Sequence, residues 1–165
     1  MTAARPGLIR LMSAALACAA AVSCSSGHDS WTWFRTFPCR DGQEVSFDVE
    51  LSDSCAYSID LISRLGKNAR TDSVTFCITF VSPSGLKAGE TVTYPSDYPM
   101  LRQYLKAHPE DRRISTAATA DYRDISWRYR DNVRPAESGT WTVSISIPDR
   151  GRAVMGAGLT INTMN

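Results

Sequence analysis

The segment VSFDVEL (residues 45–51) alternates apolar and polar side chains, and WTVSISI (residues 141–147) repeats the pattern later in the chain. Successive side chains of a β-strand point to opposite faces, so a period of two indicates a strand with one buried face. Turn-forming pairs bound both segments: Asp41-Gly42 and Ser138-Gly139 precede them, and Pro148-Asp149 follows the second. Half-buried antiparallel strands are the expected outcome.

Six further segments carry weaker strand signals and are separated by turn-forming sequences such as residues 66–68 and 82–85. They are residues 31–37, 57–65, 73–81, 90–94, 125–130 and 154–162. Short strands at this spacing, with no strand–helix–strand rhythm, favour an all-β fold. The sequence therefore predicts an antiparallel β-sandwich of about eight strands.

One segment breaks the strand pattern. Ser96-Asp97 is suited to cap a short helix near residues 97–107, in which Pro99 fits the first turn and Pro109 lies beyond the end. Apolar residues recur within it at helical spacing: Met100, Leu101, Tyr104 and Leu105. The next residues, 110–120, are charged or small, and we expect a loop there.

The N-terminus has the pattern of a bacterial lipoprotein leader. Two arginines precede an apolar stretch (residues 11–20), and small residues 21–23 stand immediately before Cys24. The apolar stretch is shorter than the roughly 18 to 20 residues that a membrane-spanning helix needs, so a cleaved signal is expected. The polar residues 25–30 that follow cannot continue it.

Cleavage before Cys24 divides the chain into a lipoprotein signal peptide (residues 1–23), a lipidated tether (24–30) and a single β-sandwich domain (31–165). Cys18 ends a second sequence of the lipobox type. Cleavage there would leave apolar residues in the tether and shorten the leader, so Cys24 is the favoured lipidation site.

Lipidation at Cys24 would attach several fatty chains, palmitate among them, through a thioether to diacylglycerol and an acylated amino terminus. Two or more chains anchor a protein stably, at about 0.8 kcal/mol per buried CH₂. We therefore expect attachment to the membrane through an N-terminal lipid anchor. Ser25 carries no signal for retention in the inner membrane, which leaves the outer membrane as the expected location.

Composition argues against several functions. The leader holds two of the 18 basic residues and none of the 17 acidic ones, leaving a net charge of −1 and no basic excess for nucleic acid. Beyond the tether, His108 is the only histidine, and no nucleophile elbow or phosphate loop occurs. Asp121, Asp124 and Asp131 lack the spacing of a calcium loop. We expect no catalytic residue, metal or cofactor.

Three cysteines follow the anchor: Cys39, Cys55 and Cys77. An odd number in an oxidising compartment leaves at least one thiol free or bonded to another molecule. Cys39 and Cys55 flank one predicted strand at opposite ends, too far apart for the 4.4 to 6.8 Å that a disulfide allows between Cα atoms. The sequence favours no required disulfide but leaves the pairing of these three open.

The C-terminal half carries a family resemblance. ISWRYRDNVR (residues 125–134) is followed by GTWTVSI (139–145) and MGAGL (155–159), and the N-terminal half adds VSFDV (45–49) and YSIDL (57–61). In this order, and with a lipobox cysteine, they resemble the gliding-motility lipoprotein H (GldH) family of Bacteroidetes. The resemblance implies an outer-membrane lipoprotein with no known catalytic centre, which serves gliding or the protein secretion associated with it.

Two aromatic groups invite a binding interpretation. Alternating aromatic and basic residues would suit a polysaccharide or an acidic partner: Trp127, Arg128, Tyr129, Arg130 and Arg134. Period two favours a plainer arrangement, with the rings in the core and the arginines in water. Trp31, Trp33 and Phe34, close to the tether, would likewise suit either the membrane interface or the core.

Two hypotheses for function follow. The leading one is a non-catalytic structural or assembly component that docks to envelope proteins. The alternative is a surface glycan-binding lipoprotein, which the four tryptophans of a small β domain suggest. A row of solvent-facing rings would favour the glycan, while buried rings would favour docking.

Overall fold

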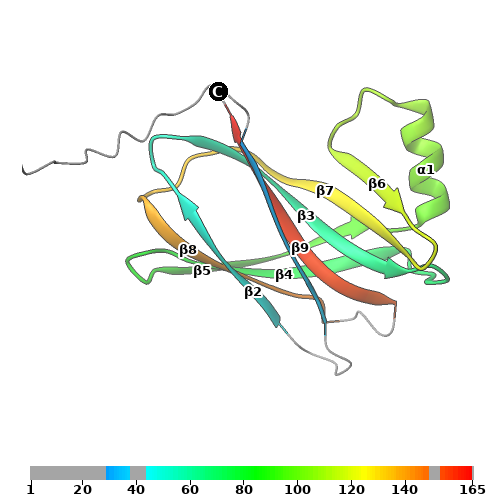
Figure 1. The fold of residues 1–165 in the computed structure, drawn as a ribbon, viewed down its shortest axis with the longest axis horizontal. Helices are drawn as coiled ribbons and strands as arrows, with labels where there is room; N and C mark the ends of the chain where they lie inside the picture. Colours follow the sequence, from blue (N-terminus) through cyan, green and yellow to red (C-terminus); the bar gives the residue numbers. More distant parts are fainter. Residues whose placement is uncertain (1–28, 38–43, 149–152, 165) are drawn as a thin grey trace, which may run out of the picture.

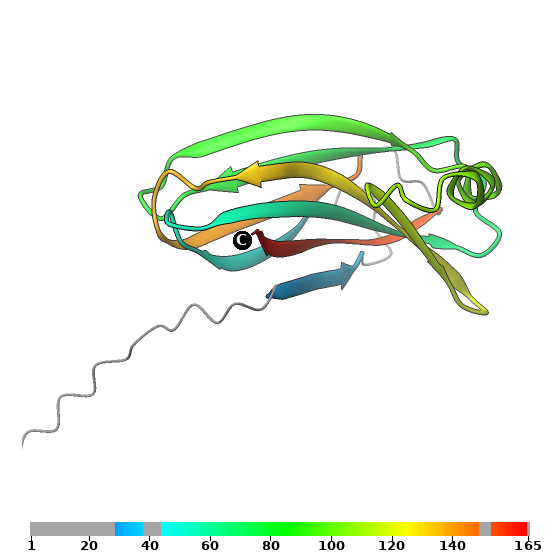
Figure 2. The same cartoon turned by 90° about the horizontal axis from the view of Figure 1, so that it is seen from above.

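The computed structural model describes residues 29–37, 44–148 and 153–164. Nine strands within these ranges form two antiparallel sheets that stack face to face (Figures 1 and 2). One sheet has the order β1-β9-β3-β7-β6 and the other β2-β8-β4-β5. The elements are β1 (Ser30–Thr36), β2 (Glu44–Leu51), β3 (Ala56–Gly66), β4 (Ser73–Val81), β5 (Lys87–Pro95), α1 (Tyr98–Ala107), β6 (Ile114–Ala118), β7 (Tyr122–Val133), β8 (Gly139–Ser146) and β9 (Val154–Met164). The predicted all-β sandwich is confirmed.

Alternation along the strands builds the core. In β2, Val45, Phe47 and Val49 are buried while the acidic and hydroxyl residues between them are exposed. In the opposite sheet Leu61 and Trp127 face inward, and both are 1% exposed. Burying each such side chain contributes about 1.5 to 3 kcal/mol. The two sheets are thus held together mainly by the apolar face of each strand.

Helix α1 forms where the sequence predicts it. The Asp97 side chain accepts a hydrogen bond from the Met100 backbone N–H at 2.9 Å, and Leu101 is buried. Such a cap satisfies one of the donors left free at the start of a helix. In the described part of the chain no helix has both the length and the apolar character to cross a bilayer.

Strand β6 corrects the prediction of a loop over residues 110–120 and raises the strand number from about eight to nine. It pairs antiparallel with β7, Ile114 opposite Trp127 and Ala118 opposite Arg123. Its sequence, ISTAA, has no clear apolar period, so nothing local announces a strand. Pairing with the long strand β7 determines its conformation, because strand preference depends strongly on the neighbouring strand.

Two glycines allow the edge strand β1 to lie close to β9. A Cβ atom at Gly158 would lie 2.3 Å from the Trp33 carbonyl oxygen, and one at Gly156 would lie 2.6 Å from the Phe34 ring. The Phe34 ring therefore reaches across β9 to β3, where the Arg64 guanidinium lies 4.4 Å from its centroid.

The Arg64 guanidinium joins three strands on the outer face of the five-stranded sheet. It also stacks on Tyr122 of β7 at 3.7 Å, and it binds both carboxylate oxygens of Asp124 at 2.7 and 2.8 Å. A bidentate pair of this kind has fixed geometry as well as charge complementarity. Together with Phe34 it fastens β1 to the body of the sheet.

We predict that Gly158→Ala destabilises the fold by about 2 to 3 kcal/mol, because the added methyl group must push the β1 backbone away. Gly66→Ala is the matched control, since its nearest neighbour would be the Met155 sulfur at 3.8 Å, an ordinary contact. Urea unfolding measures both. Equal midpoints for the two variants would contradict the close approach of β1 to β9.

Candidate functional site

The sandwich has an open end, and the space between the sheets there forms an apolar hollow that we call the mouth. It has a volume of about 290 Å³, near the lower limit of small-molecule sites. Apolar side chains from both sheets line it, among them Leu51, Ile59, Phe80, Val133 and Trp141. Glu90, Tyr129, Arg130 and Arg134 stand among them.

Two irregularities in β7 shape one wall of the mouth. Asp60 lies opposite Arg128 but Ile59 lies opposite Arg130, so Tyr129 is an extra residue in β7. Between Ile59 and Tyr57 the strand gains a second extra residue, and Asn132 in this stretch has a φ of 55°. Such β-bulges redirect side chains and are frequent beside functional sites.

The first bulge turns Arg130 away from the direction that period two predicts. Its Nη2 lies 2.6 Å from Glu90 Oε1, on β5 of the opposite sheet. The Tyr129 hydroxyl donates to the same carboxylate oxygen, and the Arg130 guanidinium lies 5.0 Å from the Tyr129 ring. Glu90, Tyr129 and Arg130 therefore form a polar latch that ties the two sheets together at the mouth.

The latch shifts the proton affinities of its members. The hydrogen bond from Tyr129, and then the Arg130 guanidinium, lower the pKa of Glu90 below its usual range. Burial, and then the bond to Glu90, raise the pKa of the Tyr129 hydroxyl. At neutral pH the latch thus joins a carboxylate, a phenol and a guanidinium that satisfy one another, and none of them is poised as a base or nucleophile.

The five predicted surface residues separate in the structure. Tyr129, Arg130 and Arg134 come together at the mouth. Trp127 belongs to the core, where its Nε1–H donates to the Pro95 carbonyl at 3.1 Å. Arg128 lies on the outer face of its sheet and pairs with Asp60 and, at 3.2 Å, with Asp131.

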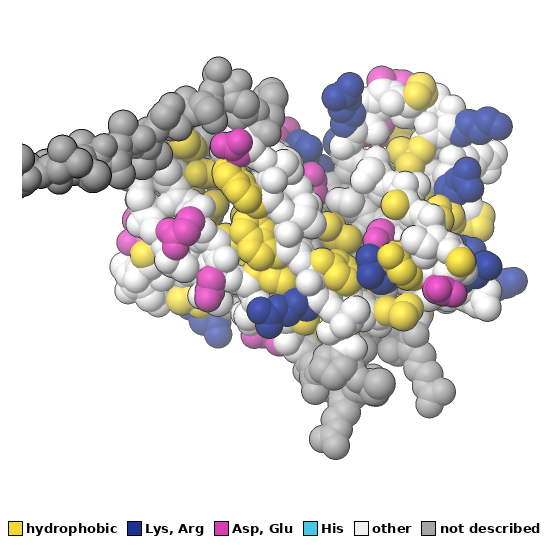
Figure 3. All heavy atoms as spheres, viewed as in Figure 1, with side chains coloured by type: hydrophobic (Ala, Val, Ile, Leu, Met, Phe, Trp, Pro, Cys, Tyr) yellow, Lys and Arg dark blue, Asp and Glu magenta, His cyan; other side chains and the backbone are white. Residues whose placement is uncertain are grey.

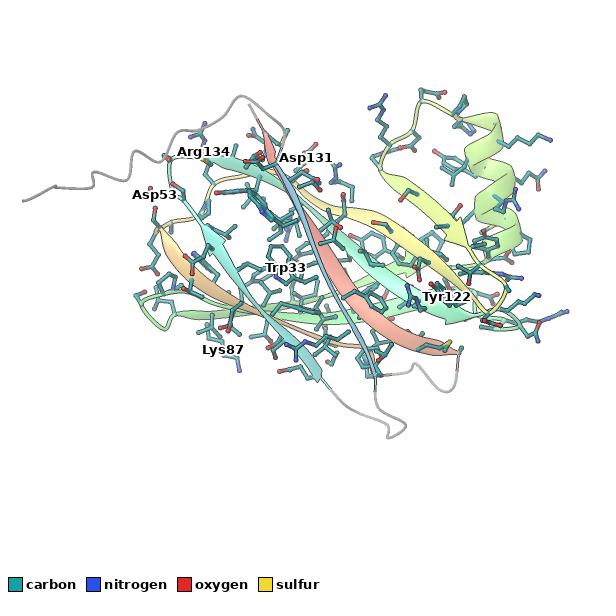
Figure 4. All side chains as sticks on the ribbon, in the orientation of Figure 1. Trp33, Asp53, Lys87, Tyr122, Asp131 and Arg134 are labelled. Atoms are coloured by element: carbon teal, nitrogen blue, oxygen red, sulfur yellow. The ribbon has the colours of Figure 1, made fainter. Side chains whose placement is uncertain are left out.

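Arg134 is the cation at the rim without a carboxylate partner among the described residues. It is exposed and donates only to the Ser54 carbonyl oxygen, at 3.3 Å. Figure 4 labels Arg134, Asp53 and Asp131 at one end of the sandwich and Tyr122 toward the other end.

Trp141 and Phe80 complete the site and were not among the predicted surface residues. The half-buried Trp141 donates from Nε1 to the Glu137 carbonyl at 3.1 Å, which fixes its ring. Phe80 stacks on Tyr129 with the rings 5° from parallel. The only signal in the sequence is the Gly-Thr-Trp turn, which gives no indication that the ring reaches the gap between the sheets.

The three aromatic residues near the predicted tether differ in their exposure and in the face of the sheet on which they lie. Trp31 is 43% exposed, Trp33 is half-buried against the core, and Phe34 is half-buried on the outer face. Figure 3 shows hydrophobic side chains gathered in a band around β1 and β2, the region in which Figure 4 labels Trp33. This band is apolar but is not a row of exposed rings.

A larger hollow, of about 610 Å³, lies at the opposite end beside the start of α1. Three of its polar groups are engaged: Ser96 donates to the Thr71 carbonyl, Asp97 caps α1, and the Arg123 guanidinium stacks on Tyr98 at 4.6 Å. Within the described ranges, no three His, Cys, Asp or Glu side chains are placed to hold a metal ion. The mouth is therefore the better candidate site.

The structure describes two of the five cysteines. Cys55 and Cys77 are free thiols that do not pair with each other, and Thr91 Oγ1 lies 3.5 Å from the Cys77 sulfur. Cys24, Cys18 and Cys39 lie outside the described residues.

No family model matches the chain, and no curated protein matches it significantly. The GldH resemblance and the lipid anchor therefore stay proposals.

We predict that the stabilising effect of the latch on the fold is lost at acidic pH. The depressed pKa of Glu90 stabilises the folded state above the unfolded value, about 4.3, and this contribution is lost as pH falls through the folded pKa. Urea midpoints measured from pH 7 to pH 3 should therefore fall more for the wild-type protein than for Glu90→Gln. Glu44→Gln, at an exposed position of β2, is the control and should follow the wild type. Parallel curves for the wild type and Glu90→Gln would exclude the latch.

Proposed function

We propose that the protein is an outer-membrane lipoprotein of the GldH type, anchored through Cys24, whose β-sandwich is a non-catalytic component of gliding or associated secretion machinery. In this role the mouth receives an apolar side chain of an envelope protein. The lipobox supports the lipid anchor, and the GldH-like segments support the family. The apolar lining of the mouth supports docking to another protein.

One observation carries the docking proposal: apart from Arg134 at the rim, the charged groups of the mouth are engaged with one another, and the surface left free is apolar. Glu90 is bound by Tyr129 and Arg130, and the Trp141 N–H is bound by a backbone carbonyl. An apolar pocket with an exposed rim suits a protruding aliphatic or aromatic side chain. It offers little for a reaction.

The glycan alternative finds less support in the same geometry. Trp127 is buried, Trp33 and Trp141 are half-buried, and only Trp31 presents a large part of its ring to solvent. Sugar recognition also needs free donors and acceptors beside the ring, and in the mouth only Arg134, among the described residues, offers donors that are not engaged with another side chain. A glycan array is the direct test, and a specific hit that depends on Trp31 would favour the alternative.

We predict that Ala88→Arg abolishes capture of the partner. Ala88 is exposed, lines the mouth and lies opposite Phe80 in the ladder, so a long charged side chain there would fill the hollow. Leu86→Arg introduces the same residue two positions away, where the side chain is 74% exposed and outside the mouth. Affinity capture from solubilised outer membrane should recover a defined protein with the wild type and Leu86→Arg but not with Ala88→Arg. Recovery of no protein by the wild type would overturn the docking function.

The lipid anchor has its own test. Metabolic labelling with radioactive palmitate should mark the wild-type protein and Cys18→Ala, whereas Cys24→Ala should lose the label and leave the membrane fraction. Retained label in Cys24→Ala would overturn Cys24 as the lipidation site, and an unlabelled wild type would remove the anchor from the proposal.

A further inference from the structure

The mouth lies at the same end of the domain as the start of β1. Ser30 pairs with Asn162 of β9, and the neighbouring rung joins Thr163 to Tyr57 of β3 and Tyr57 to Val133 of β7. Val133 lines the mouth. Ser30 and Val133 are thus one rung and three strands apart, about 14 Å at the usual 4.8 Å spacing of strands.

The residue before β1 is also fixed at this end. The Asp29 carbonyl accepts a hydrogen bond from the Thr163 backbone N–H at 2.9 Å, and the Asp29 N–H donates to the Thr163 hydroxyl at 3.0 Å. Four residues lie between Cys24 and Asp29, and the five residue steps from one to the other span at most about 18 Å at full extension. With one more step to Ser30 and the distance across the sheet, an anchor on Cys24 would hold the mouth within about 35 Å of the bilayer surface.

The opposite end has no such restriction. Strand β3 alone is 11 residues long, about 36 Å, and α1 lies beyond it at the far end (Figures 1 and 2). Two features of the near end suit a membrane surface. Trp31 exposes 43% of its surface beside Ser30, and tryptophan is favoured at membrane interfaces. Arg134 offers a cation with no carboxylate partner among the described side chains.

We infer that the mouth faces the membrane and that its partner is an integral membrane protein, which presents an apolar side chain within about 35 Å of the bilayer surface. This inference rests on the proposed lipid anchor and docking function, and it narrows the partner to one class. A soluble envelope protein would have to enter the space of at most about 35 Å between the mouth and the bilayer surface, where an integral membrane protein already lies. The short tether also raises the local concentration of the mouth for a partner in the same membrane.

The first test lengthens the tether. Insertion of 20 Gly/Ser residues after Ser26 extends the five-residue span to 25 residues, and effective concentration falls as about the −3/2 power of linker length, or about tenfold. Capture of the partner by crosslinking in intact cells should fall by that factor, while lipidation and urea stability stay unchanged. A yield that does not change would overturn the membrane-side position of the partner.

The second test identifies the partner class. The photo-crosslinking residue p-benzoylphenylalanine replaces the exposed Ala136 at the rim of the mouth or, as matched control, Met100 on α1, which is 53% exposed. The Ala136 position should capture a protein that, in cells lacking the bait, stays in the membrane after an alkaline carbonate wash, and the Met100 position should capture none. Capture of a soluble protein at Ala136 would overturn the inference but leave docking intact. A lipid adduct alone, or no adduct together with no affinity partner, would overturn the docking function as well.

Discussion

The extra residue that β7 gains at Tyr129 is the feature on which the open end of the sandwich depends. If β7 alternated regularly through Tyr129 without a bulge, Arg130 would point away from the gap between the sheets, and Glu90 would face an apolar opening with only Tyr129 as a partner. A carboxylate removed from water without partners is costly, whereas one that is bound by a phenol and a guanidinium is tolerated. The bulge therefore lets a charged residue of one sheet stand at the opening between the two sheets. It also leaves the remaining lining apolar and open.

This arrangement explains why the two sheets are joined at the mouth and yet leave apolar side chains there for a partner to contact. The latch joins β5 to β7 at one point, and Phe80, stacked on Tyr129, continues the contact toward β4. Beyond these contacts Trp141 and Val133 line the mouth and are left half-buried, although Trp141 also packs against the core. Half-buried aromatic and aliphatic side chains beside a polar rim are the usual composition of the centre of an interface. The sandwich thus ends in a surface whose burial a partner would complete.

The strands whose apolar and polar residues alternate could be predicted from the sequence. The features that depend on how one strand pairs with another could not. VSFDVEL and WTVSISI carry their burial in their own alternation, and Asp97 with Pro99 marks the start of α1. Strand β6 lacked any such signal and exists because β7 offers it a partner. The direction of Arg130 follows from a bulge, and its partner Glu90 lies 40 positions away in the chain. Asn132 is the one local hint, because asparagine tolerates the left-handed backbone that its φ of 55° requires.

The position of strand β1 determines how the domain would bear a pulling force. It is the edge strand nearest to the tether, and its seven residues pair with β9 from Ser30 to Thr36. Ladder hydrogen bonds run perpendicular to the strands, so a pull from an anchored Cys24 along β1 would load all of them at once, in shear, instead of opening them one after another. Phe34, lying over the glycines of β9 and against Arg64, resists the same sliding. The close approach that the glycines allow would then let a small domain withstand tension between the proposed lipid anchor and the proposed partner.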